Sequence, residues 1–229
     1  MIVLAAHGTR DPAGPVVIEA LADGVRSALP GETVCVAYAD VRSPSVADVL
    51  SRHPGERVVV VPAFLSAGYH VRTDIPRQIV ASGHPRTVLA DAFGPAPELI
   101  AVLIERLVAN GYRHGDGVIL AAAGSSDHRA LIDVHDVAYA LGVRLGAPVR
   151  VGYAATARPS VPDAVAALRA TRPDARVAVA SWLLAPGLFQ RRLDDAGADV
   201  AANPLGAHPR VVDLIVRRYQ AAVGALAAA

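Results

Sequence analysis

The chain has 229 residues, of which 53% are hydrophobic and 19% charged, so it can bury the core of one large domain or two smaller ones. The net charge of +1 argues against a nucleic-acid-binding protein, which usually carries a strongly basic face. No apolar run approaches the roughly 20 residues that cross a bilayer, and no basic segment precedes the first apolar stretch. The single cysteine, Cys35, allows no internal disulfide. We therefore expect a cytoplasmic protein without membrane contact.

The first half of the chain alternates short apolar runs with longer amphipathic ones. The pattern predicts strands over residues 2–6, 33–39, 57–61 and 87–90, and helices over residues 15–29 and 99–107. The strand runs are continuously apolar, which is typical of parallel strands covered on both faces. Strands alternating with helices then predict a three-layer α/β/α domain with a parallel sheet, of flavodoxin-like or Rossmann-like topology.

The same pattern restarts at Gly117. It predicts further strands over residues 118–122, 149–153 and 176–180, and helices over residues 130–145, 161–170 and 211–223. Residues 38–46 align with 153–161, and residues 93–97 align with 205–209. These matches indicate an internal duplication into two similar domains. The turn-forming residues between the copies place the boundary so that the domains are 1–113 and 114–229.

Two histidines occupy corresponding places in the first copy and are missing from the second. His7 closes the strand 2–6, and its counterpart in the second copy is Ala123. His70 lies past the strand 57–61, and its counterpart is Phe189. Asp40 follows the strand between them in the sequence. Because the carboxyl ends of parallel strands meet at one edge of a sheet, we expect one site with two imidazoles and a carboxylate.

This set of residues is typical of a site that handles a metal ion. Neutral imidazole binds iron, cobalt, nickel and zinc, and it also accepts protons near pH 7. Two histidines with at most one carboxylate leave the coordination sphere open, unlike a structural zinc site with four protein ligands. A plainer interpretation also exists, in which the histidines are structural and Asp40, Ser43 or Asp74 only caps a helix.

The loops that follow the first three strands carry further hydrogen-bond donors. Arginine guanidinium groups there can bind carboxylates in a bidentate manner, and hydroxyl groups add neutral donors. The candidate substrate-binding residues are Thr9, Arg10, Arg42, Ser43, Ser66 and Arg72. We therefore expect an anionic small molecule as the partner of this site.

Residues 4–10 (LAAHGTR) together with residues 62–76 (PAFLSAGYHVRTDIP) resemble the class II tetrapyrrole chelatases. Within that family they are similar to the sirohydrochlorin chelatases of siroheme and cobalamin synthesis. The resemblance extends over the whole chain, because long members of the family consist of two similar α/β halves. It implies that His7 and His70 handle the metal, and that Asp40 stands where the family often has an acidic residue. The second half would then complete the wall of the cleft.

The resemblance implies insertion of a divalent metal into sirohydrochlorin, an anionic tetrapyrrole. We expect Fe²⁺, with Co²⁺ as a close second, no permanently bound cofactor, and a monomer with pseudo-two-fold halves. Two alternatives stay open. One is a phosphoryl-transfer enzyme of the histidine phosphatase type, although Ala6 replaces the arginine that usually precedes its histidine. The other is a non-catalytic carrier of a metal or a tetrapyrrole.

Overall fold

The computed structural model describes residues 1–227, which form two compact units. Unit 1 comprises Met1–Gly94 and the chain from Ala207 onward, and unit 2 comprises Pro95–Gly206. Within the described residues, no helix combines the length and the apolar character that crossing a membrane requires.

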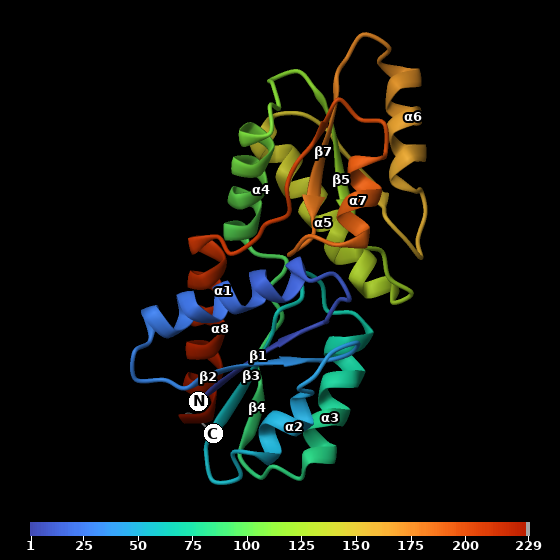
Figure 1. The fold of residues 1–229 in the computed structure, drawn as a ribbon. Helices are drawn as coiled ribbons and strands as arrows, with labels where there is room; N and C mark the ends of the chain where they lie inside the picture. Colours follow the sequence, from blue (N-terminus) through green and yellow to red (C-terminus); the bar gives the residue numbers. More distant parts are fainter. Residues whose placement is uncertain (228–229) are drawn as a thin grey trace. The chain divides into compact units, whose positions relative to one another are not determined.

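Each unit is built around one four-stranded sheet (Figure 1). The elements of unit 1 are β1 (Ile2–Ala6), α1 (Ala13–Ala28), β2 (Val34–Tyr38), α2 (Val46–Ser51), β3 (Val58–Pro62), the π-helical turn η1 (His70–Asp74), α3 (Ile75–Ser82), β4 (Thr87–Leu89) and α8 (Pro209–Ala227). The elements of unit 2 are α4 (Pro97–Ala109), β5 (Gly117–Ala122), α5 (His128–Leu145), β6 (Val149–Tyr153), α6 (Val161–Thr171), β7 (Val177–Trp182), α7 (Leu188–Asp194) and β8 (Val200–Ala201).

Both sheets are parallel, with the strand orders β2-β1-β3-β4 and β6-β5-β7-β8. Successive strand residues point to opposite faces of a sheet. In unit 1, Val3 and Val60 pack with α2 and α3 on one face. The helices α1 and α8 pack together on the other face (Figure 1). In unit 2, α6 and α7 cover one face, and α4 and α5 lie on the other. The predicted duplicated α/β/α fold with parallel sheets is confirmed.

The last helix of each sequence repeat belongs to the other unit. The helix α4 follows β4 in the chain but packs on β7 and α5 of unit 2, and α8 packs on β3 and α1 of unit 1. The compact units therefore differ from the predicted domains 1–113 and 114–229. The sequence repeat cannot reveal this exchange, because each helix has the same apolar face whichever sheet it covers.

The short helices α2, α3 and α7 were not among the predicted elements, since each offers only about two turns of apolar periodicity. The N-cap of α2 is Ser45, whose side chain accepts from the backbone of Asp48 while the Asp48 side chain accepts from the backbone of Ser45. Asp40 and Ser43, the candidate caps in the sequence, do not have this role. Ser160 and Asp163 form the same capping box at α6.

A partly buried hydrogen-bond network attaches α8 to the start of the chain. The Glu32 carboxylate accepts hydrogen bonds from the Tyr219 hydroxyl and from the terminal ammonium of Met1, and these bonds lower the pKa of Glu32. Burial, together with the hydrogen bond to Glu32, raises the pKa of Tyr219 to about 12. The helix α8 is thus held in unit 1 by polar bonds as well as by its fully buried residues Leu214 and Ile215.

If α8 is part of the core of unit 1, Leu214→Ala should lower the free energy of unfolding by about 2–5 kcal/mol, as buried leucine truncations do. Urea denaturation followed by circular dichroism measures this change. Gln220→Ala, on the exposed side of the same helix, is the matched control and should change stability by less than about 0.5 kcal/mol. Equal effects of the two substitutions would contradict the assignment of α8 to this core.

Candidate metal-handling site

The imidazole rings of His7 and His70 meet at the carboxyl edge of the unit 1 sheet. Their centroids lie 4.4 Å apart and the ring planes cross at 79°, so one ring presents its edge to the other. His7 directly follows β1, and His70 begins η1 after the loop that leaves β3. Because β1 and β3 pair in parallel, the chain leaves both strands at the same edge. The structure therefore brings the two predicted histidines together.

Hydrogen bonds fix which nitrogen of each ring carries the hydrogen. The Nδ1 atom of His70 lies 2.9 Å from Oδ2 of Asp74, and Nδ1 of His7 lies 2.9 Å from the carbonyl oxygen of Gly8. A carboxylate or carbonyl oxygen only accepts, so both Nδ1 atoms donate. In the neutral rings, each Nε2 then keeps its lone pair. Since a metal–imidazole bond is about 2.0–2.1 Å long, one cation can reach two rings at this separation.

Asp74 orients His70 and does not cap the helix that follows. The sequence predicted a cap at this position, but the Asp74 side chain makes no capping hydrogen bond to α3. The i,i+4 spacing of His70 and Asp74 was the available signal, because this spacing places two residues on one helical face. A carboxylate bound to the distal nitrogen of a histidine fixes the ring and increases its strength as a metal ligand.

Gln78 extends this arrangement to the end of β2. Its Nε2 lies 3.5 Å from Oδ1 of Asp74 and donates to the carbonyl oxygen of Ala39 at 2.8 Å. Its Oε1 accepts from the backbone N–H of Val46 at 3.0 Å. Gln78 therefore links the support of His70 to the loop that carries Asp40. Sequence reasoning did not single out this residue.

Aromatic side chains surround the two imidazoles. The Phe64 ring lies 6.1 Å from His7 and stacks on His70 at 6.0 Å with an interplanar angle of 29°. The Tyr69 ring lies 5.6 Å from His70 at nearly a right angle. These contacts limit rotation of His70, which is half-buried, whereas His7 remains exposed. The pair is thus held in place on one side and open to a ligand on the other.

Asp40 lies beside His7 in the backbone, but its carboxylate is engaged locally. Its N–H donates to the His7 carbonyl at 3.0 Å, and its Oδ1 accepts from the Val41 N–H at 2.7 Å. Gly8 permits this close approach, because its φ is +94° and a Cβ there would collide with the Asp40 carbonyl oxygen. Among residues 1–227, no three histidine, cysteine or acidic residues are grouped to hold a metal. The geometry thus supports a pair of imidazole ligands.

The predicted substrate-binding residues all lie on loops at this edge or on the turn beside it. Arg10, Arg42, Ser43 and Arg72 are exposed, and Thr9 and Ser66 are partly buried. The Arg42 guanidinium donates to the Thr9 carbonyl at 2.9 Å, and Nε of Arg72 donates to the Ala67 carbonyl at 2.7 Å. A guanidinium has five N–H donors, so one such bond orients the group and leaves others for a carboxylate. Their binding role stays a prediction.

The corresponding edge of unit 2 has no imidazoles in these two places. Ala123 follows β5, and Phe189 lies in the first turn of α7 with the Arg192 guanidinium 5.8 Å from its ring centroid. Trp182, which replaces Ala63 of the first copy, is only 3% exposed. Its burial supports a space-filling role and does not support contact with a ligand.

The family model CbiX matches residues 1–110 and 117–222 of the chain. The sirohydrochlorin ferrochelatase of Priestia megaterium is 25% identical over 234 residues, which cover 93% of this chain and 87% of the relative. The sirohydrochlorin cobaltochelatase of Methanopyrus kandleri is 33% identical over 81 residues, which cover 34% of this chain and 57% of the relative.

A solved structure described as SirB from Bacillus subtilis with Fe³⁺ has the same fold. It superposes with a TM-score of 0.81 and is 20% identical, covering 96% of this chain and 93% of its own. At this level of identity the likeness concerns the fold alone.

The geometry predicts that Co²⁺ binding depends on both histidines and on Asp74. We expect His7→Ala and His70→Ala each to weaken Co²⁺ binding at least about tenfold, and Asp74→Asn to weaken it about 10- to 100-fold, because outer-shell carboxylates have effects of this size. Isothermal titration calorimetry measures the affinity.

His53 and Glu56 provide the matched control, because their side chains form a similar imidazole–carboxylate pair at 2.8 Å elsewhere in unit 1. His53→Ala and Glu56→Gln should leave Co²⁺ affinity unchanged. Equal losses at the two pairs would contradict a specific site at His7 and His70.

Proposed function

Because the chain belongs to the CbiX family, we propose that it inserts a divalent metal ion into sirohydrochlorin, with Fe²⁺ as the preferred metal and Co²⁺ second. The relative matched over nearly its whole length is a ferrochelatase, which supports the preference for iron. The cobaltochelatase similarity covers only about a third of the chain. Both relatives are described as chelatases, which favours metal insertion over the phosphoryl-transfer alternative.

The observation that carries this proposal is the isolated pair of imidazoles whose Nδ1 atoms both act as donors. A chelatase must bind its metal and then release it to the macrocycle. Two protein ligands hold an ion less firmly than the four of a structural site, and they leave coordination positions for water and for pyrrole nitrogens. The metal is therefore a substrate of this site, and we assign no resident cofactor.

Metal insertion also requires proton transfer. The metal replaces two pyrrole N–H protons, so two protons leave the macrocycle for each divalent ion that enters. A neutral imidazole can accept a proton at Nε2 or bind the metal there, which suits both parts of the reaction. Asp74 keeps the Nδ1 atom of His70 as the donor, so that Nε2 stays available. We propose His7 and His70 as the catalytic residues, with Asp40 as the acidic residue beside them.

The acetate and propionate groups of the macrocycle would bind to the loops around this pair. Arg10, Arg42 and Arg72 supply cationic donors, and the hydroxyl groups of Thr9, Ser43 and Ser66 supply neutral ones. Each chain contains its own complete histidine pair within unit 1. We therefore propose that a single chain suffices for the reaction, in the cytoplasm expected from the sequence.

Anaerobic incubation of sirohydrochlorin with Fe²⁺ or Co²⁺, followed by absorption spectroscopy, tests this function. We expect the protein to accelerate the change from the metal-free to the metallated spectrum. His7→Ala and His70→Ala should lower the rate by about 10²-fold or more, the usual contribution of a positioned acid–base group. His53→Ala should retain the full rate. Tight binding of sirohydrochlorin or metal without turnover would contradict the proposal and favour the carrier alternative.

A further inference from the structure

The side-chain amide of Gln78 is bonded at both ends. Its Oε1 accepts from the N–H of Val46, the first residue of α2, where helical N–H groups lack a partner within the helix. Its Nε2 donates to the carbonyl oxygen of Ala39 at 2.8 Å and lies 3.5 Å from Oδ1 of Asp74. A primary amide has two N–H donors, so one serves the carbonyl and the other the carboxylate. A single group therefore joins the end of β2, the start of α2 and the end of η1.

One branch of this connection leads to His70. Oδ2 of Asp74 lies 2.9 Å from Nδ1 of His70, while Oδ1 faces Gln78, so each carboxylate oxygen has its own partner. The side chains of His70 and Asp74 are both 26% exposed, so water has access to them. A carboxylate with two partners cannot rotate without losing one of them. Gln78 thus helps to keep Asp74 on His70.

The other branch leads to His7. The N–H of Ala39 donates to the carbonyl of Ala6 at 2.8 Å, and the N–H of Asp40 donates to the carbonyl of His7 at 3.0 Å. The segment that carries Ala39 is therefore bonded directly to the backbone of His7. Because Gln78 binds the carbonyl of Ala39, the same amide reaches the backbone support of the second imidazole.

We propose that Gln78 is a positioning residue of the metal site, which sets the separation of His7 and His70 by binding the support of each. Its role rests on the proposed function of this pair, whose ring centroids lie 4.4 Å apart. Ligands of one ion have to stay within about 0.5 Å of the productive geometry. A side chain bonded to both supports restricts the movement of one ring relative to the other.

Unit 2 shows that the scaffold does not require an amide at this place. Ile75 and Leu193 are both fully buried in the cores of their units, and they correspond at an offset of 118 residues. This offset is one less than that of His70 and Phe189, because the π-helical turn η1 contains one residue more than a turn of α-helix. At the offset of 118 residues, an alanine, residue 196, takes the place of the glutamine.

A different group binds the corresponding strand-end carbonyl in unit 2. Ala154 aligns with Ala39, and its carbonyl accepts from Nη1 of Arg192 at 3.0 Å. Arg192 takes the place of Asp74. Unit 2 therefore keeps a donor for the carbonyl, whereas the histidine, the carboxylate and the amide are all replaced. Such a joint replacement is expected if these three residues serve one function, because packing alone preserves only the bond to the carbonyl.

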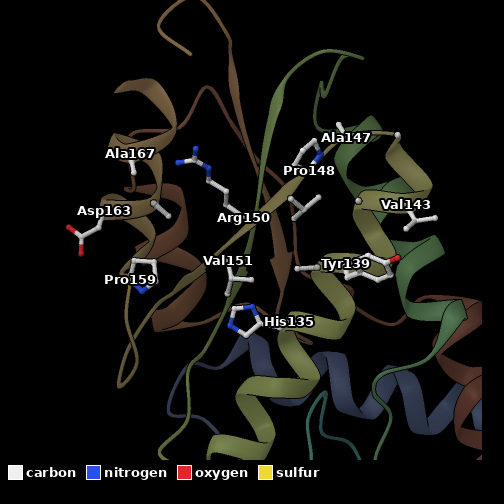
Figure 2. Close-up of a pocket in the computed structure, with 15 residues that line it drawn as sticks. His135, Tyr139, Val143, Ala147, Pro148, Arg150, Val151, Pro159, Asp163 and Ala167 are labelled. Atoms are coloured by element: carbon white, nitrogen blue, oxygen red, sulfur yellow. The ribbon is translucent and has the colours of Figure 1, made fainter. Parts of the chain in front are cut away.

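The open groove of about 860 Å³ in unit 2 does not provide a substitute for the histidine pair (Figure 2). It lies between α5, β6 and α6, and most of its lining side chains are valine, alanine or proline. Among the described residues that line it, His135 is the one imidazole, and its Nε2 lies 3.4 Å from the hydroxyl oxygen of Tyr153. Unit 2 is therefore a suitable place for control substitutions.

Gln78→Met tests the proposal, because it removes both donors and the acceptor at nearly unchanged size. We expect Co²⁺ affinity, measured by isothermal titration calorimetry, to fall about three- to tenfold, less than for a residue that touches the ligand itself. Gln78→Asn keeps the amide but is one methylene shorter, so it should also lose affinity. In an Asp74→Asn background the loss caused by Gln78→Met should be at least about twofold smaller, because one branch is already broken. An equal loss in both backgrounds contradicts action through Asp74.

Gln190 of α7 provides the matched control. Its Nε2 donates to Oδ1 of Asp194 at 2.8 Å and to the carbonyl of Ala202 at 3.2 Å, and its Oε1 accepts from the Ser181 hydroxyl at 2.7 Å. Gln190→Met thus removes bonds of the same kind from a more deeply buried amide. It should leave Co²⁺ affinity unchanged, even where it lowers the free energy of unfolding.

Imidazole ¹⁵N spectra provide a readout that a merely structural role would not change. In the unaltered chain the neutral ring of His70 should carry its hydrogen on Nδ1, and Gln78→Met should populate the form with the hydrogen on Nε2, because Asp74 is no longer held against the ring. A His70 that keeps one tautomer in both Gln78 variants overturns the proposal. If His7→Ala and His70→Ala weaken Co²⁺ binding while Gln78→Met behaves like Gln190→Met, the positioning role fails and the proposed function stands. Full Co²⁺ affinity in both histidine variants overturns the two together.

Discussion

The parallel pairing of β1 with β3 is the constraint on which the site depends. Pairing of Ala5 with Pro62 puts the ends of both strands at the same level of the sheet, so that His7 emerges next to the loop that leads to His70. That loop contains Phe64, whose ring contacts both imidazoles. The backbone hydrogen bonds of the sheet, together with this aromatic contact, hold two side chains together although 62 residues separate them in the sequence.

The support of the histidine pair extends over all three neighbouring strands at this edge. Asp74 holds His70, and Gln78 connects Asp74 with the carbonyl of Ala39 at the end of β2. A metal ligand needs such support, because a freely rotating imidazole loses rotational entropy whenever it binds an ion. The hydrogen bonds of Asp74 and Gln78 already restrict the His70 ring in the folded protein, so less rotational entropy is lost when the ring binds an ion. It also explains why a carboxylate near the site does not have to touch the metal to affect it.

Much of the fold follows from the sequence, because it rests on periodicity. The strand runs 2–6 and 149–153 were predicted with the observed bounds, and the continuous apolar character of the strands correctly indicated parallel sheets. The exchange of α4 and α8 between units was not predictable, since an amphipathic helix carries no mark of the sheet that it will cover. The short helix α3 was missed because two turns give too little periodicity.

For the site, the sequence indicated which residues converge but not how they are supported. The expectation that the carboxyl ends of parallel strands meet at one edge of the sheet was enough to bring His7 and His70 together. By contrast, the i,i+4 spacing of His70 and Asp74 brings the two side chains to one face only if residues 70–74 are helical, and nothing in a single sequence predicts the π-helical turn η1 at that point. Asp40 was correctly expected at the same edge of the sheet. Its carboxylate, however, accepts from the N–H of Val41 in a local turn, which the sequence did not predict. Loop geometry, which depends on a few backbone angles, decides such details.

The two copies show that one scaffold tolerates different chemistry at its edges. Core positions such as Val25 and Leu141 keep their apolar character in both units, because the packing of helix on sheet requires it. The exposed edges have no such requirement. Unit 1 has His7 and His70 at its carboxyl edge, whereas unit 2 has Ala123 and Phe189 in the corresponding places. In unit 1, Arg26 of α1 donates to the carbonyl oxygen of Val34 on β2, whereas Gly142 of α5 takes the corresponding place in unit 2. The conserved core therefore leaves the edge of each unit free to change while the packing of both units is kept.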